Sequence, residues 1–379
     1  MCARLRHRRW MMVETAHSLV PIMPLRPTSC RLALLALLAL CALAGAVAAQ
    51  EPAVALRGAV VTAESGDFVP YAVVVLEPRF SQRFTDQAGS FAFLGVTPGT
   101  YRLQVRQVGF LPFDSTITVA AAPPPLRIAL VRIAVELRGI TVAARTRCLP
   151  PGRLDAAATP ALVTIVEQLR LNAQRQALLL DRYPFQYHVV RELTDVLRGG
   201  FEHTRTDTLL LRSNTRWSYA PGRVVTESAE LQGTGTRDVH LPVLADFADS
   251  SFQAWHCFGL GGMQVVEGRE LVRLDFRASP ELREPDVNGT AYLDPVSYQV
   301  VRTRVELTRL EQAAAGVTSW TATVTFREIM PNLATADRLS AVTRLVPRNV
   351  PSTVVERRET QQLLRFSFLR APPVADSPP

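Results

Sequence analysis

The stretch FTDQAGSFAFLGVTPGTYRLQVRQVGF, residues Phe84–Phe110, decides the fold of the first part of the chain. Its segment DQAG runs from Asp86 to Gly89 and fits a type I turn, because Asp offers an acceptor at the first position and Gly suits the last. Pro98 and Gly99 fit the centre of a type II turn, where Pro fixes φ and Gly adopts a positive φ. We therefore interpret these four residues as structural turn residues and not as catalytic ones.

The segments around these turns alternate between apolar and polar residues. In SFAF, residues 90–93, both phenylalanines fall on one face of an extended chain. In TYRLQVR, residues 100–106, the aromatic and aliphatic side chains share one face, and arginine and glutamine occupy the other. Such alternation predicts strands with one buried and one solvated face.

A second segment, GAVVTAESGDFVPYAVVVLE from Gly58, carries a family resemblance together with the opening stretch. The two resemble the carboxypeptidase regulatory-like domain, over residues 54–132. That resemblance implies a seven-stranded, transthyretin-like β-sandwich, which is found in many secreted and envelope proteins, and a non-catalytic accessory role.

The segment after the sandwich, VELRGITVAARTR at residues 135–147, is similar to the one that leads from this domain into the plug of TonB-dependent transporters. The chain beyond it is too short for both a plug and a large barrel, and it lacks the regular membrane strands of one. We interpret residues 133–158, which include the run CLPPGRLDAAA, as a linker.

The N-terminal part of the chain predicts export. Arg31 is followed by the uncharged run Leu32–Ala49, which ends in small residues, so residues 1–49 are interpreted as a signal peptide cleaved after Ala49. The alternative to a cleaved signal peptide is that the same segment remains as an uncleaved membrane anchor. The start codon is either Met1 or Met23. No later run has the length of a membrane span, so we expect no transmembrane helix in the mature chain and a periplasmic, outer-membrane-associated or secreted location.

The formal net charge of +8 belongs mostly to this leader. The rest of the chain has no basic stripe interleaved with aromatic residues, which argues against nucleic acid as a partner.

The second half of the chain predicts an α+β domain over residues 159–370. Apolar residues recur at helical spacing over residues 160–183, and strand-like segments follow, from FQYHVVREL to ERRETQQLLRFSFLR. We expect one long helix and a curved antiparallel sheet, in a chain that is mainly β, and a disordered tail over residues 371–379. The pattern of DVNGTAYLDPVSYQVVRTRVEL is similar to that of lipoprotein-carrier-like proteins, which wrap a sheet around a helix and bind acyl chains.

Catalytic motifs are absent from the sequence. There is no His-Glu-x-x-His, Gly-x-Ser-x-Gly or phosphate-loop pattern, and the run GLGG at residues 259–262 is interpreted as a flexible turn. Asp275 has no acidic neighbour in its strand. We therefore predict no catalytic residue, no metal ligand and no cofactor, and interpret the histidines after the leader as solvated or half-buried: His188, His203, His240 and His256.

Two cysteines, Cys148 and Cys257, remain after removal of the leader. Because export places them where disulfides persist, we predict a bond between them that ties the linker to the second domain.

The sequence thus favours a non-enzymatic envelope protein with a docking or structural sandwich and a sheet that binds an apolar small ligand or an envelope protein. A carbohydrate- or peptide-binding accessory module is one alternative. The other is a hydrolase whose site is assembled in the second domain, with His188, His203 or His256 involved.

Overall fold

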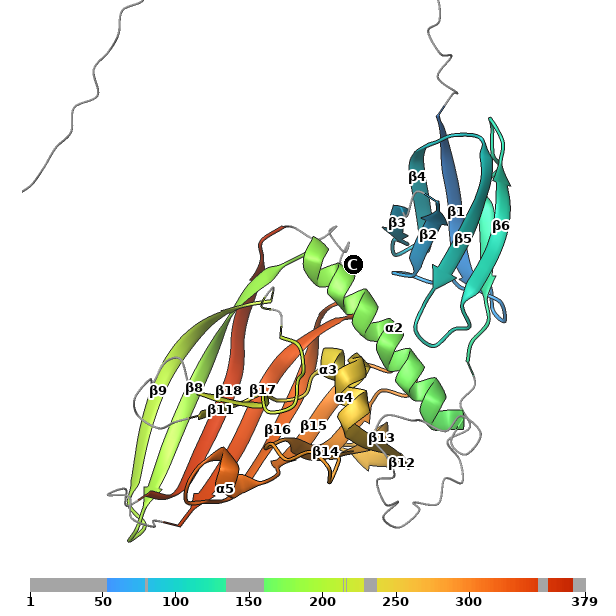
Figure 1. Cartoon of the computed structure of the whole chain (residues 1–379). Coiled ribbons are helices and arrows are strands. Elements are labelled where there is room, and N and C mark those ends of the chain that lie inside the picture. The colour runs from blue at the N-terminus through green and yellow to red at the C-terminus, as the bar shows by residue number, and fades with distance from the viewer. Residues whose placement is uncertain are drawn as a thin grey trace, which may run out of the picture. The chain divides into compact units, whose positions relative to one another are not determined.

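The computed structural model describes residues 53–78, 81–133, 160–213, 215, 217–227, 237–346 and 354–370. Over these residues the chain is mainly β with one long helix (Figure 1), as the sequence predicts. The predicted signal peptide with Ala49, Cys148, almost all of the linker and the tail lie outside the described residues.

The first part is a seven-stranded β-sandwich, which confirms the expected fold. One sheet has the order β4-β1-β7 and the other β3-β2-β5-β6. The strands are β1 (Val54–Thr62), β2 (Val73–Glu77), β3 (Ser81–Phe84), β4 (Ser90–Val96), β5 (Gly99–Arg106), β6 (Phe113–Val119) and β7 (Leu126–Leu130). In β5 the predicted alternation is present: Tyr101, Leu103 and Val105 are buried between the sheets, while the arginines beside them are exposed.

The DQAG segment forms a tight turn between β3 and β4. The amide of Gly89 donates to the carbonyl of Asp86 (3.0 Å), and the amide of Ser90 donates to Asp86 Oδ1 (2.8 Å). Gly89 has φ of +66°, and a Cβ on it would lie 2.6 Å from the carbonyl oxygen of Val60, so only glycine fits there.

The Pro98-Gly99 connection differs from the predicted type II turn. Gly99 has φ of +156°, far from the +80° or so of that turn type. The strands on either side of it, β4 and β5, belong to different sheets. The chain at Pro98-Gly99 therefore bends from one sheet to the other. It does not connect two neighbouring strands of one sheet, as a hairpin turn does.

The second part is built on a nine-stranded antiparallel sheet with the order β12-β13-β14-β15-β16-β17-β18-β8-β9. These strands are β8 (Phe185–Leu197), β9 (Glu202–Arg212), β12 (His256–Val266), β13 (Arg269–Ala278), β14 (Val287–Leu293), β15 (Val300–Leu307), β16 (Val317–Met330), β17 (Leu333–Leu345) and β18 (Val354–Phe368). The sheet is a meander from β12 to β18, and the earlier hairpin β8-β9 adds to its end.

The remaining elements are short apart from one helix. They are α2 (Pro160–Arg182), α3 (Leu244–Ala248), α4 (Ser250–Trp255), α5 (Leu310–Ala313) and the paired strands β10 (Val225–Glu227) and β11 (Arg237–Val239). In Figure 1 the long helix α2 crosses one face of the curved sheet, and α3 and α4 lie on the same face. We call this the inner face. Phe247 and Phe252 from these short helices and Phe276 from β13 are fully buried there.

Helix α2 follows the predicted amphipathic pattern only in its first half. Pro160 at its start needs no amide partner, and Leu162, Ile165 and Leu169 are buried as their spacing predicts. In the second half Ala177 is exposed, and the polar side chains of Asn172 and Arg175 are buried together with Leu171 and Leu179.

The GLGG run is not a turn, which corrects the interpretation from sequence. Residues 259–262 lie within β12, and the register shifts between Leu260 and Gly262 to give a bulge where Gly262 has φ of +72°. A β-bulge needs a residue with such freedom, so the glycines bend the strand instead of ending it. The segment RWSYA at residues 216–220 is one of the strand-like segments that lie between FQYHVVREL and ERRETQQLLRFSFLR, but it is irregular where it is described.

Candidate functional site

Among the described residues, Tyr219, His256 and Asp286 form a buried cluster of titratable groups. The hydroxyl of Tyr219 donates to Asp286 Oδ2 (2.5 Å), and His256 Nε2 lies 3.3 Å from Asp286 Oδ1. Burial, and then the hydrogen bond to Asp286, raise the pKa of Tyr219 above its usual range. The three residues are 4%, 1% and 0% exposed, so the cluster is closed to solvent and belongs to the core.

His256 is held on all sides. Its Nδ1 lies 2.9 Å from the carbonyl oxygen of Phe252, its Nε2 lies 3.2 Å from that of Val287, and its ring stacks on Phe252 at 3.8 Å. An acceptor oxygen thus lies beside each ring nitrogen. At 1% exposure His256 is a buried structural residue, which corrects its interpretation from sequence as solvated or half-buried.

The strand register separates the three histidines of the hydrolase alternative. His203 pairs with Asp195 on the inner face, whereas His188 pairs with Leu210 on the outer face. His256 begins β12, at the other end of the sheet order. The structure therefore does not bring these histidines together. His240 is placed elsewhere again, with its ring stacked on Trp217 and Nε2 3.0 Å from Asp246 Oδ2.

Asp275 also lacks a partner for acid–base chemistry. It accepts hydrogen bonds from Arg273 Nε (2.9 Å) and Thr290 Oγ1 (2.6 Å), both on its own face of the sheet. No group of three or more His, Cys, Asp or Glu side chains with metal-ligand geometry occurs among the described residues.

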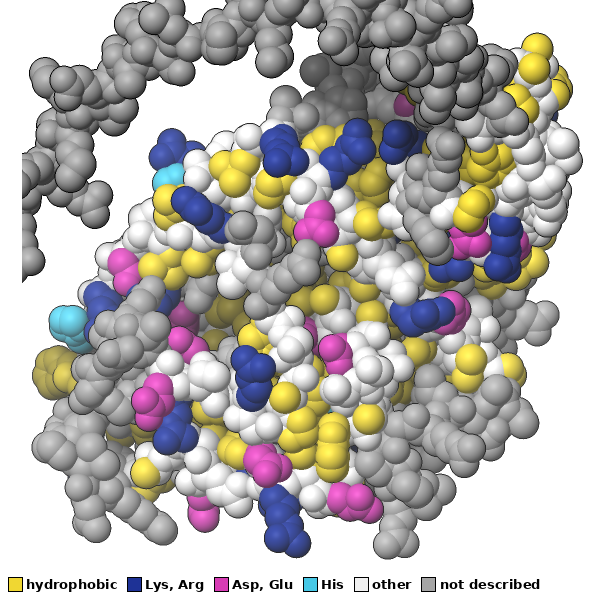
Figure 2. Space-filling model, turned by 45° about the horizontal axis from the view of Figure 1, so that its top comes forward, with side chains coloured by type: hydrophobic (Ala, Val, Ile, Leu, Met, Phe, Trp, Pro, Cys, Tyr) yellow, Lys and Arg dark blue, Asp and Glu magenta, His cyan; other side chains and the backbone are white. Residues whose placement is uncertain are grey.

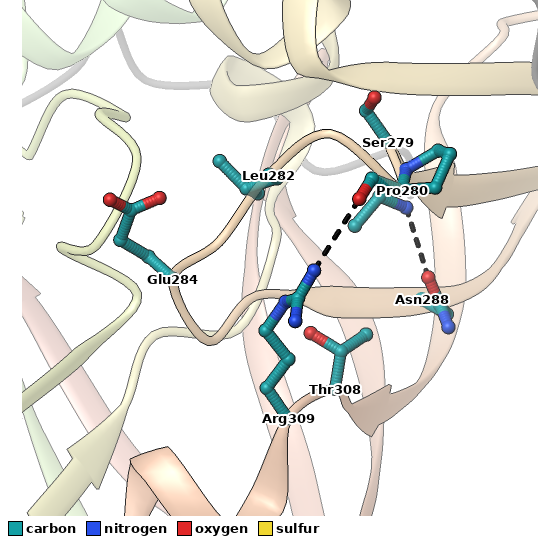
Figure 3. Close-up of a pocket in the computed structure, with 8 residues that line it drawn as sticks. Ser279, Pro280, Leu282, Glu284, Asn288, Thr308 and Arg309 are labelled. Atoms are coloured by element: carbon teal, nitrogen blue, oxygen red, sulfur yellow. Dashed lines mark hydrogen bonds between the residues drawn. The ribbon is translucent and has the colours of Figure 1, made fainter.

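A small pocket of about 240 Å³ opens beside the buried cluster (Figure 3). Arg309 donates to the carbonyl of Pro280 (3.4 Å), and Glu284 projects from the opposite side of the pocket. Thr308 connects the pocket to the core, since its Oγ1 accepts from the amide of Asp286 (2.9 Å). The pocket is smaller than most ligand sites, and its exposed Glu284 has no second carboxylate in the lining.

A larger apolar surface lies on the inner face where the sheet ends in β18, β8 and β9. Cross-strand pairs share a face, so the register places these side chains on one side. Phe185 pairs with Phe368, Tyr187 pairs with both Phe366 and Leu211, and Val189 pairs with both Leu363 and Leu209. We call these eight residues the aromatic end: Phe185, Tyr187, Val189, Leu209, Leu211, Leu363, Phe366 and Phe368.

The aromatic end is only partly covered. Phe185 is 2% exposed and packs with Leu179 and Leu180 of α2, whereas Leu211 on the outermost strand is 38% exposed. The rings of Phe185, Phe366 and Phe368 meet edge to face at 5.7–6.3 Å between centroids. Burial raises the pKa of the Tyr187 phenol. An apolar surface thus runs from the core to solvent along one face.

The same face becomes charged further along the strands. Arg357 forms a bidentate pair with Asp195 (2.6 and 3.0 Å), and Arg191 forms one with Asp207 (3.1 and 2.7 Å). The arginine of the second pair lowers the pKa of Asp207. We call these four residues the charged end. It is close to neutral because each arginine has a carboxylate partner. In the view of Figure 2, basic and acidic side chains are interspersed among hydrophobic ones.

Sequence analysis missed the polar side chains that α2 buries: Gln168, Asn172 and Arg175. Asn172 Nδ2 donates to the carbonyl of Tyr298 (3.0 Å), and its Oδ1 accepts from Arg175 Nη2 (2.7 Å). Burial lowers the pKa of Arg175 to about 9. Their burial could have been predicted from their spacing at i, i+4 and i+7. This spacing places them on the same helix face as Leu162 and Ile165.

The same helix face contacts the segment between β5 and β6. Gln168 Oε1 accepts from the amide of Gly109 (2.8 Å), and Arg175 Nη1 donates to Gln107 Oε1 (3.0 Å). Val108 between them is 5% exposed.

Comparison with known proteins identifies the first part of the chain. Residues 55–131 match the family model of the carboxypeptidase regulatory-like domain, as the turn and strand motifs predict. No curated protein matches the chain. The match covers the sandwich and not the second part.

Solved structures with some likeness to the chain include three bacterial proteins. They are a DUF1329 family protein from Desulfovibrio piger (10% identity, TM-score 0.29), a domain described as an outer membrane lipoprotein-sorting protein from Vibrio parahaemolyticus (12%, 0.29) and a LolA superfamily protein from Nitrosomonas europaea (10%, 0.27). The alignments cover 54–56% of this chain and 93–96% of the others. At TM-scores this low, the function has to be argued from this chain's own residues.

Within the described residues, no helix combines the length and hydrophobicity needed to cross a membrane.

Proposed function

We propose that the chain is an exported, non-enzymatic binding protein of the cell envelope, and that its second domain holds the apolar part of an amphipathic ligand on the inner face. The observation that carries this proposal is the aromatic end. It gathers eight apolar side chains on one face of three neighbouring strands. Phe185, Val189 and Leu363 among them are buried, and Leu211 at the margin is 38% exposed.

The distribution of charge favours an amphipathic ligand over a wholly apolar one. The charged end follows the aromatic end along the same strands, so a ligand lying along them meets hydrophobic and then ionic groups. The Arg357–Asp195 and Arg191–Asp207 pairs are bidentate and near neutral together, which suits a polar or singly charged headgroup more than a multiply charged anion.

The absence of a shared site for the candidate histidines and the burial of the Tyr219–His256–Asp286 cluster support a binding role. Export rests on the predicted signal peptide, and a structural or docking role for residues 55–131 rests on their family match.

The test is binding of 11-(dansylamino)undecanoic acid, a fluorescent fatty acid, to the mature chain from Gln50 onward. Binding in an apolar site raises the dansyl emission. We expect the wild-type chain to bind, and Leu211→Asp to weaken binding about tenfold or more, because a carboxylate replaces an aliphatic side chain that contacts the ligand.

Leu210→Asp is the matched control. Leu210 is the preceding residue of β9, is 55% exposed, and projects from the outer face because it pairs with His188. We expect this variant to bind as the wild type does. Equal losses in the two variants, or no binding by the wild-type chain, would contradict the proposal.

A further inference from the structure

A second cavity lies within the β-sandwich, separate from the inner face of the large sheet. It has a volume of about 530 Å³, within the range of small-molecule sites, and is lined by β1, β4, the start of β7, and β3 with the turn that follows it. Its apolar lining includes Phe84, Phe91 and Leu126. Nothing in the proposed function uses this cavity.

Gly58 in the lining of the cavity allows a close approach between β1 and Phe91. Gly58 in β1 lies opposite Phe91 in β4 and beside Leu126 in β7. A Cβ on Gly58 would lie 2.6 Å from Phe91 Cζ and 2.8 Å from the carbonyl oxygen of Leu126. The absence of a side chain therefore lets the Phe91 ring, which is 5% exposed, pack against β1 in the core of the sandwich.

Two arginines from different sheets line the same cavity. Arg57 belongs to β1 and Arg83 to β3, and both are exposed. Neither forms an ion pair with any carboxylate of the described residues. Arg83 Nη1 donates only to the neighbouring carbonyl of Gln82 (2.8 Å), and its guanidinium lies 5.8 Å from the Phe93 ring centroid. By contrast, Arg102 of the same sandwich is paired with Asp114 at 2.6 Å.

The one carboxylate in the lining does not cancel these charges. Asp86 is fixed by its turn, since its Oδ1 accepts from the amide of Ser90 at 2.8 Å. Arg57 and Arg83 together with Asp86 leave the cavity with a net positive charge.

We infer that this cavity binds an organic anion. Its carboxylate or equivalent group lies between Arg57 and Arg83, where guanidinium groups offer charge-assisted hydrogen bonds, and its apolar body packs on Phe84 and Leu126. The site adjoins the aromatic end, because Phe84 also packs against the cluster of Leu179, Phe185 and Leu333, but its arginines belong to the sandwich alone. The inference therefore does not rest on binding of an amphiphile by the second domain.

The test uses 4-phenylbutyrate and its uncharged counterpart 4-phenylbutanol, which share an apolar body and differ in charge. Each is titrated into the isotopically labelled mature chain, and amide shifts are followed by NMR. We expect saturable shifts at residues 57–59 and 90–92 with the acid, and affinity for the alcohol lower by about fivefold or more. Equal affinity for acid and alcohol would overturn the assignment of an anion site.

Arginine variants locate the charge. Arg57→Gln and Arg83→Gln are each expected to weaken 4-phenylbutyrate binding about fivefold, whereas Arg106→Gln, an exposed change on β5 away from the cavity, is expected to leave it unchanged. Equal effects of all three changes would show a general response to net charge and would also overturn the inference. Thermal melting of each variant checks that the fold is intact.

The Leu211→Asp variant separates the two sites. It is expected to lose the dansyl fatty acid and to keep 4-phenylbutyrate, because Leu211 belongs to β9 of the other domain. Loss of both ligands in this variant would contradict two independent sites.

Discussion

The phenol of Tyr219 donates a 2.5 Å hydrogen bond to Asp286 Oδ2, and so joins two residues that are 67 positions apart in the sequence. Both side chains lie in the core, next to the stacked rings of Phe252 and His256. A buried carboxylate is costly unless donors surround it, and here the donors are the Tyr219 hydroxyl, the amide of Val287 and the imidazole.

Tyr219→Phe is expected to lower the free energy of unfolding by about 1–3 kcal/mol, because it leaves Asp286 Oδ2 buried without this donor. Urea denaturation measures the change. Tyr183→Phe is the control: its hydroxyl accepts from the exposed Arg182 (3.0 Å), so its loss is expected to cost less than about 0.5 kcal/mol. A Tyr219→Phe variant as stable as the wild type would show that the hydrogen bond does not contribute.

Tyr219 is expected to make the stability of the protein fall at alkaline pH. The pKa of Tyr219 is raised in the folded state, so the folded chain keeps a proton that the unfolded chain loses near pH 10. This contribution is complete below about pH 10 and is lost as the pH rises further, by up to about 1.4 kcal/mol per pH unit for one proton. Unfolding measured from pH 8 to 11 checks the slope.

Tyr219→Phe is the internal control for that slope and is expected to flatten it. Tyr187 and Tyr298, whose pKa values burial also raises, add to the slope in the same direction. Arg175 acts in the opposite direction above about pH 9, because its lowered pKa means that the unfolded chain keeps a proton that the folded chain loses. An unchanged slope in the variant would assign the alkaline effect to other groups.

Gly289→Ala in β14 is expected to destabilise the protein by about 1–3 kcal/mol. A Cβ at this position would lie 2.3 Å from the carbonyl oxygen of Arg304 and 2.6 Å from Phe276 Cζ, and backbone cannot move aside cheaply. Gly259→Ala in β12 is the matched change, since nothing lies within 4 Å of its Cβ position. We expect it to be neutral or slightly stabilising. Similar losses in both variants would show that the close contacts around Gly289 do not cause the destabilisation.

The sandwich is expected to fold as a separate fragment, residues 54–132. Its core cluster, from Leu56 to Leu130, is made within this range. Far-UV circular dichroism of the fragment should show a β spectrum. Val108 and Phe84 are exceptions, because Val108 lies in one core cluster of the second part and Phe84 packs against another. A disordered or helical spectrum would refute autonomous folding.

Cys148 and Cys257 are expected to form a disulfide in the exported protein, which remains a prediction because Cys148 lies outside the described residues. Thiols are counted after unfolding without reductant. We expect none to react, and two after reduction. Two reactive thiols per chain in normally exported, unreduced protein would exclude the bond.

Local patterns were enough to predict the sandwich, the helix α2 and most strands of the large sheet. Alternation in β5 and the Asp86–Gly89 turn report on neighbours only a few residues away, and the backbone responds to them directly. The GLGG run was misread for the same reason, since glycine marks both turns and bulges. Only pairing with β13 makes residues 259–262 a bulged strand.

The candidate sites depended on tertiary structure. The sequence by itself determined a mainly β chain with a carboxypeptidase regulatory-like sandwich and a helix-plus-sheet domain, because hydrophobic period and turn chemistry are local properties. Only the strand order decided that β8 and β9 follow β18, which places Leu211 beside Tyr187 on the inner face and His188 on the outer face. Only the stacking of two sheets brought Arg57 and Arg83 to one cavity. Contacts between residues distant in the chain arise from the packing of whole elements, and no short stretch of sequence encodes them.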